Sequence, residues 1–262
     1  MSKKPSYISA SQINQYVFCP IAYRYLYIDK VKKDEGNIYT AYGSAIHEAL
    51  AFNFRQKIKS GIDLSPKEVN EAFLTFLEQE KNKLNGQTNS PHGDWETISL
   101  QGENMLHAYM KEMAPTIQPK FVEKEFTLQL KNFPITIRGF IDLIDVDDWI
   151  IDHKTAGKTT YRTWTQAKVN DSIQFTLYSA AFRKMFGREE KGIRADILPR
   201  ENKPRFKQIE SGRSEEEILR VLNMATTIEK IIETGIWIPN LANCGQCPFR
   251  DICPRQPIIE NN

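Results

Sequence analysis

Two aspartates and a lysine lie between short apolar runs in the stretch GFIDLIDVDDWIIDHKT, residues 139–155. The Asp-Asp pair in the middle of this stretch is typical of a turn, so we predict a hairpin that folds about residue 147. In that register Asp142 faces Asp152 directly, and their Cβ atoms lie about 5 Å apart. Lys154 is two residues beyond Asp152, so its side chain leaves the same face of the strand.

The two opposed carboxylates predict a metal site. They repel each other, and burial raises the cost of their charges. Apolar neighbours predict that the strands are covered on both faces. These neighbours are Phe140, Ile144, Ile150 and Ile151. A divalent cation would remove the repulsion, and oxygen ligands suit Mg²⁺ or Mn²⁺. Lys154 would then place positive charge beside a phosphate oxygen or an attacking water. An exposed hairpin with surface ion pairs fits this stretch equally well.

The arrangement G-x-I-D-x9-D-x-K resembles the PD-(D/E)xK nuclease superfamily. In that pattern Asp142 is the first acid, Asp152 is the second and Lys154 is the lysine. Ile141 stands where the pattern has proline, and RecB-like members of the superfamily tolerate an apolar residue there. The resemblance implies a metal-dependent enzyme that hydrolyses the phosphodiester bonds of DNA. It also implies a restriction-endonuclease-like core.

Two further stretches resemble motifs of the RecB-like nucleases. GSAIHEAL, residues 43–50, resembles the G-x-x-x-H helix motif, which implies that His47 is a metal ligand. VEKEF, residues 122–126, resembles the acidic strand before the first motif acid. Glu123 and Glu125 share one face of such a strand, and the family spacing favours Glu123 as the catalytic acid. Taken alone, His47 also fits a structural role and the two glutamates fit a half-exposed strand.

QFTLY, residues 174–178, resembles the RecB-like Q-x-x-x-Y motif. Gln174 and Tyr178 are four residues apart, so they share a helix face. The resemblance implies that they face a groove and either contact DNA or order the site, whereas a structural tyrosine is the alternative. It also implies that the backbone carbonyl of His153 is a further metal ligand.

The four cysteines form a split pattern, C-x2-C-x5-C near the C-terminus and one cysteine near the N-terminus. This pattern resembles the iron–sulfur motif of AddB-type nucleases and of the RecB-like nucleases of CRISPR adaptation. Four thiolates suit a [4Fe–4S] cluster, and they also suit tetrahedral zinc. One cysteine plus three favours the cluster, because zinc sites more often use two close pairs. The expected ligands, which would tie the two ends of the chain together, are Cys19, Cys244, Cys247 and Cys253.

The composition is ordinary for a globular protein, with 40% hydrophobic and 26% charged residues among 262. A net charge of +2 neither marks nor excludes a nucleic-acid binder, since a local groove can be basic. The basic stretches 30–33 and 200–207 are candidate DNA contacts, and each also fits a solvated surface. Without a long apolar run or a signal-peptide pattern, we expect a cytoplasmic protein with no membrane partner.

Apolar periodicity predicts helices that begin near residues 9, 42, 66, 95, 171 and 214, with a loop over 86–94. Segments rich in β-branched residues predict strands over 121–130, 135–146, 149–154, 191–199 and 205–210. We therefore predict one RecB-like α/β nuclease domain over 1–262. It comprises a mainly helical part (1–115), a PD-(D/E)xK core whose mixed central sheet is flanked by helices (116–212), and a C-terminal helix with the cysteine-bearing tail (213–262).

These features predict a divalent-metal-dependent deoxyribonuclease, an exonuclease of single-stranded DNA or DNA ends in recombination, repair or phage DNA processing. One alternative is a nuclease subunit that acts with a separate helicase or recombinase, or in a CRISPR adaptation complex. The sequence has no G-x4-G-K-[S/T] motif, so any motor would be another protein. Another alternative is a non-catalytic DNA-binding module with structural zinc, which the intact set Asp142, Asp152 and Lys154 disfavours.

Overall fold

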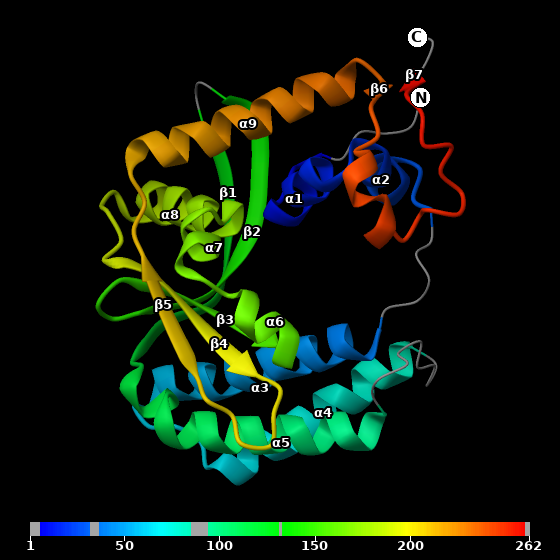
Figure 1. Ribbon diagram of the computed structural model, residues 1–262. Coiled ribbons are helices and arrows are strands. Elements are labelled where there is room, and N and C mark those ends of the chain that lie inside the picture. The colour runs from blue at the N-terminus through cyan, green and yellow to red at the C-terminus, as the bar shows by residue number, and fades with distance from the viewer. Residues whose placement is uncertain (1–5, 32–36, 85–93, 131–132, 260–262) are drawn as a thin grey trace.

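The computed structural model describes residues 6–31, 37–84, 94–130 and 133–259, and Figure 1 shows a sheet between two groups of helices. The loop predicted over 86–94 lies outside the described residues except for its last position. Positions 32 and 33 of the first basic stretch also lie outside them.

The sheet contains five strands: β1 Pro119–Leu130, β2 Phe133–Asp145, β3 Trp149–Ala156, β4 Gly192–Pro199 and β5 Lys207–Ser211. They are ordered β1-β2-β3-β4-β5. All neighbouring strands are antiparallel except β3 and β4, which run parallel. A parallel pair needs a crossover connection, and the helices between β3 and β4 supply it. The predicted mixed sheet with flanking helices is therefore confirmed.

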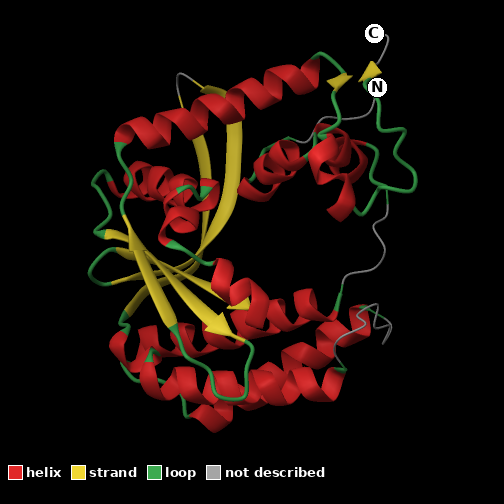
Figure 2. Cartoon of the chain, in the orientation of Figure 1, coloured by secondary structure: helices red, strands yellow, loops and turns green. Residues whose placement is uncertain are grey.

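Helices cover both faces of the sheet (Figure 2). On one side lie α3 Ile38–Ser60, α4 Pro66–Lys83 and α5 Trp95–Glu112. On the other lie α1 Ala10–Phe18, α8 Ile173–Phe186 and α9 Glu215–Glu233. The shorter helices are α2 Pro20–Tyr23, η1 Arg24–Ile28, η2 Ala114–Thr116, α6 Lys158–Thr163, α7 Gln166–Asn170 and η3 Leu241–Gln246. Within the described ranges, no helix has the length and apolar character needed to cross a membrane.

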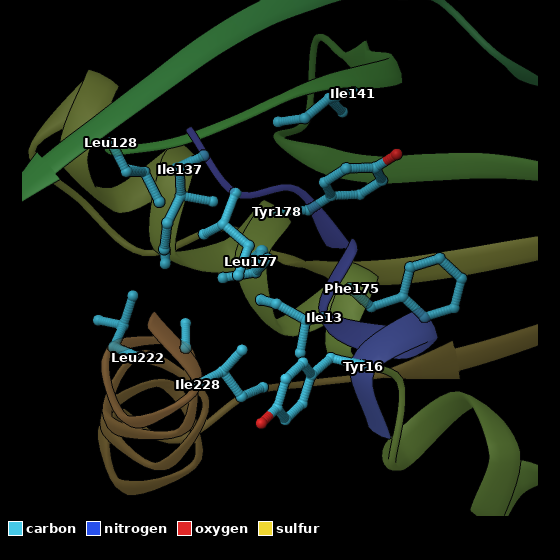
Figure 3. Close-up of a cluster of buried hydrophobic side chains, with 14 of the residues drawn as sticks. Ile13, Tyr16, Leu128, Ile137, Ile141, Phe175, Leu177, Tyr178, Leu222 and Ile228 are labelled. Atoms are coloured by element: carbon cyan, nitrogen blue, oxygen red, sulfur yellow. The ribbon is translucent and has the colours of Figure 1, made fainter. Parts of the chain in front are cut away.

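Two hydrophobic cores lie against the sheet, one on each face. The first joins α1, α8 and α9 to β1 and β2, and Figure 3 shows Ile13, Leu177 and Leu222 meeting in it. The second joins α3, α4 and α5 to the sheet. The hairpin of β2 and β3 serves both cores, because Ile144 belongs to the first and Leu143 to the second. Burial on both faces holds the strands that carry the candidate acids.

Capping residues explain where three of the helices begin. The Ser9 hydroxyl accepts a hydrogen bond from the Gln12 amide at the start of α1. Ser65 and Ser214 each form a capping box with a glutamate three residues later, before α4 and α9. Each cap satisfies backbone groups that the helix itself leaves without partners, so these predicted helix starts are confirmed.

The predicted hairpin register is confirmed for two pairs, Leu143 with Ile151 and Ile144 with Ile150. Asp142 and Asp152 would come next, but the ladder between β2 and β3 does not continue to them. The prediction that both faces of the hairpin are covered is wrong at Phe140, whose side chain is 53% exposed. The strand pairing ends here, and Asp142 lines a cavity at this end.

The segment from β6 Ile236–Trp237 to β7 Ile258–Ile259 lies beside α1 and α2, so both ends of the described chain meet (Figure 1). Asn243 donates from Nδ2 to the Phe18 carbonyl oxygen at 2.7 Å. Tyr23 stacks on Trp237 with ring centroids 6.3 Å apart. Tyr23 is only 1% exposed and is therefore a core residue.

Candidate metal centre

Three potential ligand atoms from three different elements converge at one end of β2. They belong to His47 on α3, Glu123 on β1 and Asp142 on β2, and all lie within 4.8 Å of one another. His47 Nδ1 is 3.2 Å from Asp142 Oδ2, and these side chains are 31% and 13% exposed. Both side chains are thus partly accessible to solvent. It brings together the histidine, the strand acid and the first motif acid that the sequence singled out.

The backbone of Glu123 departs from the regular strand. Val122 pairs with Leu143 and Lys124 pairs with Ile141, so Glu123 lies across from Asp142. Glu123 has φ +48°, in the left-handed region. For a residue other than glycine this conformation costs about 1–3 kcal/mol, and such strain is common at functional sites. The strained backbone accompanies a side chain that reaches the ligand cluster.

Glu125, the alternative acid of this strand, has a different environment. Its Oε1 accepts a hydrogen bond from Arg138 Nη2 at 2.6 Å, and both side chains are about half exposed. The structure therefore separates two glutamates that strand parity treats as equivalent. Glu123 lies with His47 and Asp142, whereas Glu125 forms a surface ion pair.

Asp152 and Lys154 form a buried ion pair beside the cluster. Asp152 is fully buried, and its Oδ2 lies 2.7 Å from Lys154 Nζ. Both carboxylate oxygens otherwise lack a hydrogen-bond partner within the described part of the chain. Asp152 is not among the mutually close ligand atoms of the cluster. A buried carboxylate held by one ammonium group alone is costly, so a second cation would stabilise it.

Lys154 is held in place by the Q-x-x-x-Y motif of α8. Its Nζ donates to Gln174 Oε1 at 2.8 Å, and Gln174 Nε2 donates to the Tyr178 hydroxyl at 2.6 Å. Tyr178 is only 3% exposed. Gln174 and Tyr178 also line a cavity of about 520 Å³ together with Asp142. The helix face predicted from sequence therefore points at the site and at an open space beside it.

Burial and mutual repulsion move the pKa values of the three carboxyls apart. Burial would raise the pKa of Asp142, but the hydrogen bond and charge of His47 outweigh it and lower that pKa to about 2. Burial, followed by the charge of Asp142, raises the pKa of Asp152 to about 6 and that of Glu123 to about 7. Two of the three acids therefore lack enough positive charge nearby.

His153 reaches the site through its backbone, while its side chain points into the second core. The His153 amide donates to Asp142 Oδ2 at 3.1 Å. Its Nε2 lies 2.8 Å from the Tyr109 hydroxyl, which donates to Asp196 Oδ2 at 3.3 Å. Burial lowers the pKa of the imidazole to about 4. The sequence analysis missed Tyr109 and Asp196, because neither belongs to a recognisable motif.

The four cysteines line one cavity between α2 and the C-terminal segment. None of them forms a disulfide. Burial, followed by the neighbouring thiols, raises the pKa of Cys247. Within the described chain, no three of the sulfur atoms lie within 4.8 Å of one another. Tetrahedral zinc with Zn–S bonds of about 2.3 Å would hold them about 3.8 Å apart. The thiols as they stand therefore do not have the spacing that a bound zinc ion would impose.

Comparisons with known proteins identify a family for this chain. The family model of the PD-(D/E)XK nuclease superfamily matches residues 7–254. A crystal structure described as "Putative exonuclease" from Eubacterium rectale has a TM-score of 0.60 at 15% identity, over 98% of this chain and 90% of the other. The crystal structure of a protein named SSO0001 has a TM-score of 0.45 at 13% identity, over 98% and 89%. A search of curated proteins gave no significant match. Because the family match spans nearly the whole sequence and includes every residue of the metal centre, this chain belongs to the PD-(D/E)XK nuclease superfamily.

Proposed function

We propose that this protein is a divalent-metal-dependent exonuclease that hydrolyses phosphodiester bonds at the ends of DNA strands. The observation that carries the proposal is the convergence of His47, Glu123 and Asp142 beside the ion pair of Asp152 and Lys154. A histidine, carboxylates and a lysine on adjacent elements are the groups that metal-assisted hydrolysis of a phosphodiester requires.

The charge of the site supports a divalent ion. With every acid ionised and His47 neutral, three carboxylates and one ammonium sum to −3 + 1 = −2. One Mg²⁺ or Mn²⁺ would neutralise this charge, and oxygen-rich sites with one histidine suit such ions. His47, Asp142 and Asp152 would hold the metal, with Glu123 and the His153 carbonyl as further ligands. The unpartnered oxygens of Asp152 fit this role.

The bound metal would lower the pKa of a water molecule and stabilise charge on the phosphate. Lys154 lies between Asp152 and Gln174, so its ammonium group is held in one position. From there it can donate to a phosphate oxygen or orient the attacking water. Tyr178 fixes Gln174 and thus acts through Lys154. Hydrolysis forms a bond from water oxygen to phosphorus, breaks the bond to the leaving oxygen, and leaves a proton on that oxygen.

We further propose that Cys19, Cys244, Cys247 and Cys253 hold a [4Fe–4S] cluster. Their common cavity and the split pattern of one cysteine plus three support this choice. The cluster would fasten α2 to the C-terminal segment. Purification without oxygen, followed by measurement of iron, sulfide and zinc, tests the proposal. Four iron atoms per chain are expected, whereas one zinc and no iron would contradict it.

The nuclease proposal is tested with end-labelled linear DNA and circular single-stranded DNA in Mg²⁺ or Mn²⁺. We expect cleavage of linear DNA only, and a loss of at least about 100-fold in Asp142→Ala. Asp147→Ala is the matched control, because this exposed aspartate lies in the turn of the same hairpin. Equal cleavage by wild type and Asp142→Ala would contradict the site. Cleavage of circles would contradict the exonuclease assignment alone.

A further inference from the structure

A second polar cavity, of about 350 Å³, lies at the C-terminal end of β3. Its lining includes Tyr39, Tyr42, Thr155, Lys158, Thr159 and Arg200. The lining contains two cationic side chains and no acidic one, so its field favours an anion. We call this cavity the Arg200 pocket. The cavity beside Asp142 differs, because it contains the Glu125–Arg138 ion pair as well as Asp142 itself.

Arg200 is fixed in the pocket by stacking. Its guanidinium carbon lies 4.0 Å from the ring centre of Tyr39 and 5.9 Å from that of Tyr42. The Arg200 amide also donates to the Ala156 carbonyl oxygen at 2.7 Å, which ties it to the end of β3. Within the described part of the chain, Arg200 makes no ion pair with a carboxylate. A stacked, unneutralised guanidinium is well suited to grip a phosphate.

Tyr42 gives an independent indication of a ligand. Its side chain is 2% exposed and lines the pocket. Its hydroxyl has no hydrogen-bond partner among the described residues. Buried polar groups are rarely left without a partner, and such a group calls for a specific explanation. An anion bound beside Arg200 would accept a hydrogen bond from this hydroxyl.

The pocket adjoins the metal centre along two elements. Thr155 directly follows Lys154 in β3, and its side chain leaves the opposite face of the strand, where α3 packs. On α3, Tyr39 and His47 are eight residues apart on one helix face, which is about 12 Å along the axis. Gly43 lies between them on that face, and a side chain there would come within 3.2 Å of the Thr155 hydroxyl. Glycine thus lets α3 approach β3 closely between the pocket and the metal centre.

We propose that the Arg200 pocket binds a backbone phosphate of the DNA strand that is being cut, next to the scissile phosphate. The inference rests on the proposed nuclease function and deepens it. Arg200 and Lys158 supply the charge, and the hydroxyls of Tyr42, Thr155 and Thr159 supply donors. Contacts of this kind position the strand and carry no sequence information. The pocket therefore fixes where along the strand the metal centre cuts.

The test compares wild type with Arg200→Gln and Lys158→Gln in binding a single-stranded oligonucleotide in EDTA. Arg205→Gln is the control, because Arg205 is exposed in the same loop and outside the pocket. Each pocket variant should weaken binding, by about tenfold or more for Arg200. Each should also reduce the slope of log affinity against log salt by about 0.7. Arg205→Gln should change neither quantity.

A scan with single methylphosphonate linkages locates the contact, because each linkage removes one phosphate charge. Wild type should lose affinity when the neutral linkage lies beside the cut position, and Arg200→Gln should no longer sense that linkage. Lys158 is exposed, so its variant keeps the test valid if Arg200→Gln folds poorly. If the pocket variants had the same salt slopes and the same methylphosphonate scans as wild type but still cleaved DNA, the proposed role of the Arg200 pocket would be wrong. Failure of wild type to cleave any DNA would instead overturn the proposed function.

Discussion

The metal centre and the cysteine cavity both gather ligands from distant parts of the chain, but they are supported differently. His47, Glu123 and Asp142 project from a long helix and two strands packed against two cores. The cysteines lie at the junction of α1 and α2, in a short 3-10 helix and in irregular chain. The first site is preformed by the fold, whereas we expect the second to need the proposed cluster to hold its segments together. Losing the bound group should therefore cost activity in one site and stability in the other.

The largest effect is expected from breaking the cysteine site. In Cys247→Ser the proposed cluster loses a ligand, so the chain ends are no longer joined. If the cluster acts as a disulfide closing a loop of this length, its loss costs about 5 kcal/mol. For a protein of this size that lowers the melting temperature by about 10–20 °C. Differential scanning calorimetry under anaerobic conditions measures the change.

Two controls separate this effect from a general loss of structure. Incubation with EDTA removes only the catalytic metal and should leave the melting temperature nearly unchanged. Cys247→Ser should still bind Mn²⁺ at a temperature where it is folded, because the metal centre lies on other elements. A variant that melts like wild type would show that the cysteines do not join the chain ends.

Replacing Asp152 should lower activity but not the melting temperature, which is the opposite of the effect expected for Cys247→Ser. Asp152→Asn removes one proposed ligand of the metal, so we expect a loss of at least about 100-fold in kcat. The folded-state pKa of Asp152 is raised to about 6, above the ordinary value of about 3.9. Its charge therefore destabilises the metal-free fold above pH 6, and that cost disappears as the pH falls. At pH 8 the metal-free variant should melt no lower than wild type.

Some features of the fold and of the metal centre were predictable from the sequence, and others were not. The hairpin register followed from two apolar runs and a turn, because strand pairing is set by local pattern. Strand parity left the choice between Glu123 and Glu125 open, and only the spacing of the family motif favoured Glu123, which the structure places in the ligand cluster. The buried contact between His153 and Tyr109 could not be predicted from the sequence, because the two residues are 44 positions apart and belong to no motif. The exposure of Phe140 depends on where the two strands stop pairing, and the pattern of apolar residues does not predict that position.

The metal centre should also respond to pH in a way that the cysteine site does not. A metal must displace the protons on Glu123 and Asp152, whose pKa values are about 7 and 6. If both are ligands, their protons alone should lower metal affinity about 100-fold between pH 7.5 and 5.5, and the proton on His47, whose pKa is raised, adds to the fall. In Glu123→Gln the proton of Glu123 no longer competes with the metal, so the fall should be about 25-fold smaller. Isothermal calorimetry with Mn²⁺ measures both, and equal falls would show that Glu123 is not a ligand.

The smallest effect is expected where the metal centre meets α8. Tyr178→Phe keeps the ring in the core and removes the hydroxyl that accepts from Gln174. Gln174 then holds Lys154 less firmly, and loss of one such hydrogen bond should lower kcat by about 2- to 10-fold. KM should stay unchanged if the hydroxyl only positions Lys154. Tyr16→Phe, a buried tyrosine of the same core, is the matched control.

The same measurement decides between the two roles that the Q-x-x-x-Y resemblance left open for Tyr178. A raised KM with an unchanged kcat would mean that the hydroxyl contacts DNA. The buried position of Tyr178 and its hydrogen bond from Gln174 favour the other role. A preformed site on rigid elements needs such internal supports, because a small shift of its lysine already weakens catalysis. The loss in kcat therefore measures how far the sheet and α8, rather than the substrate, set the geometry of Lys154.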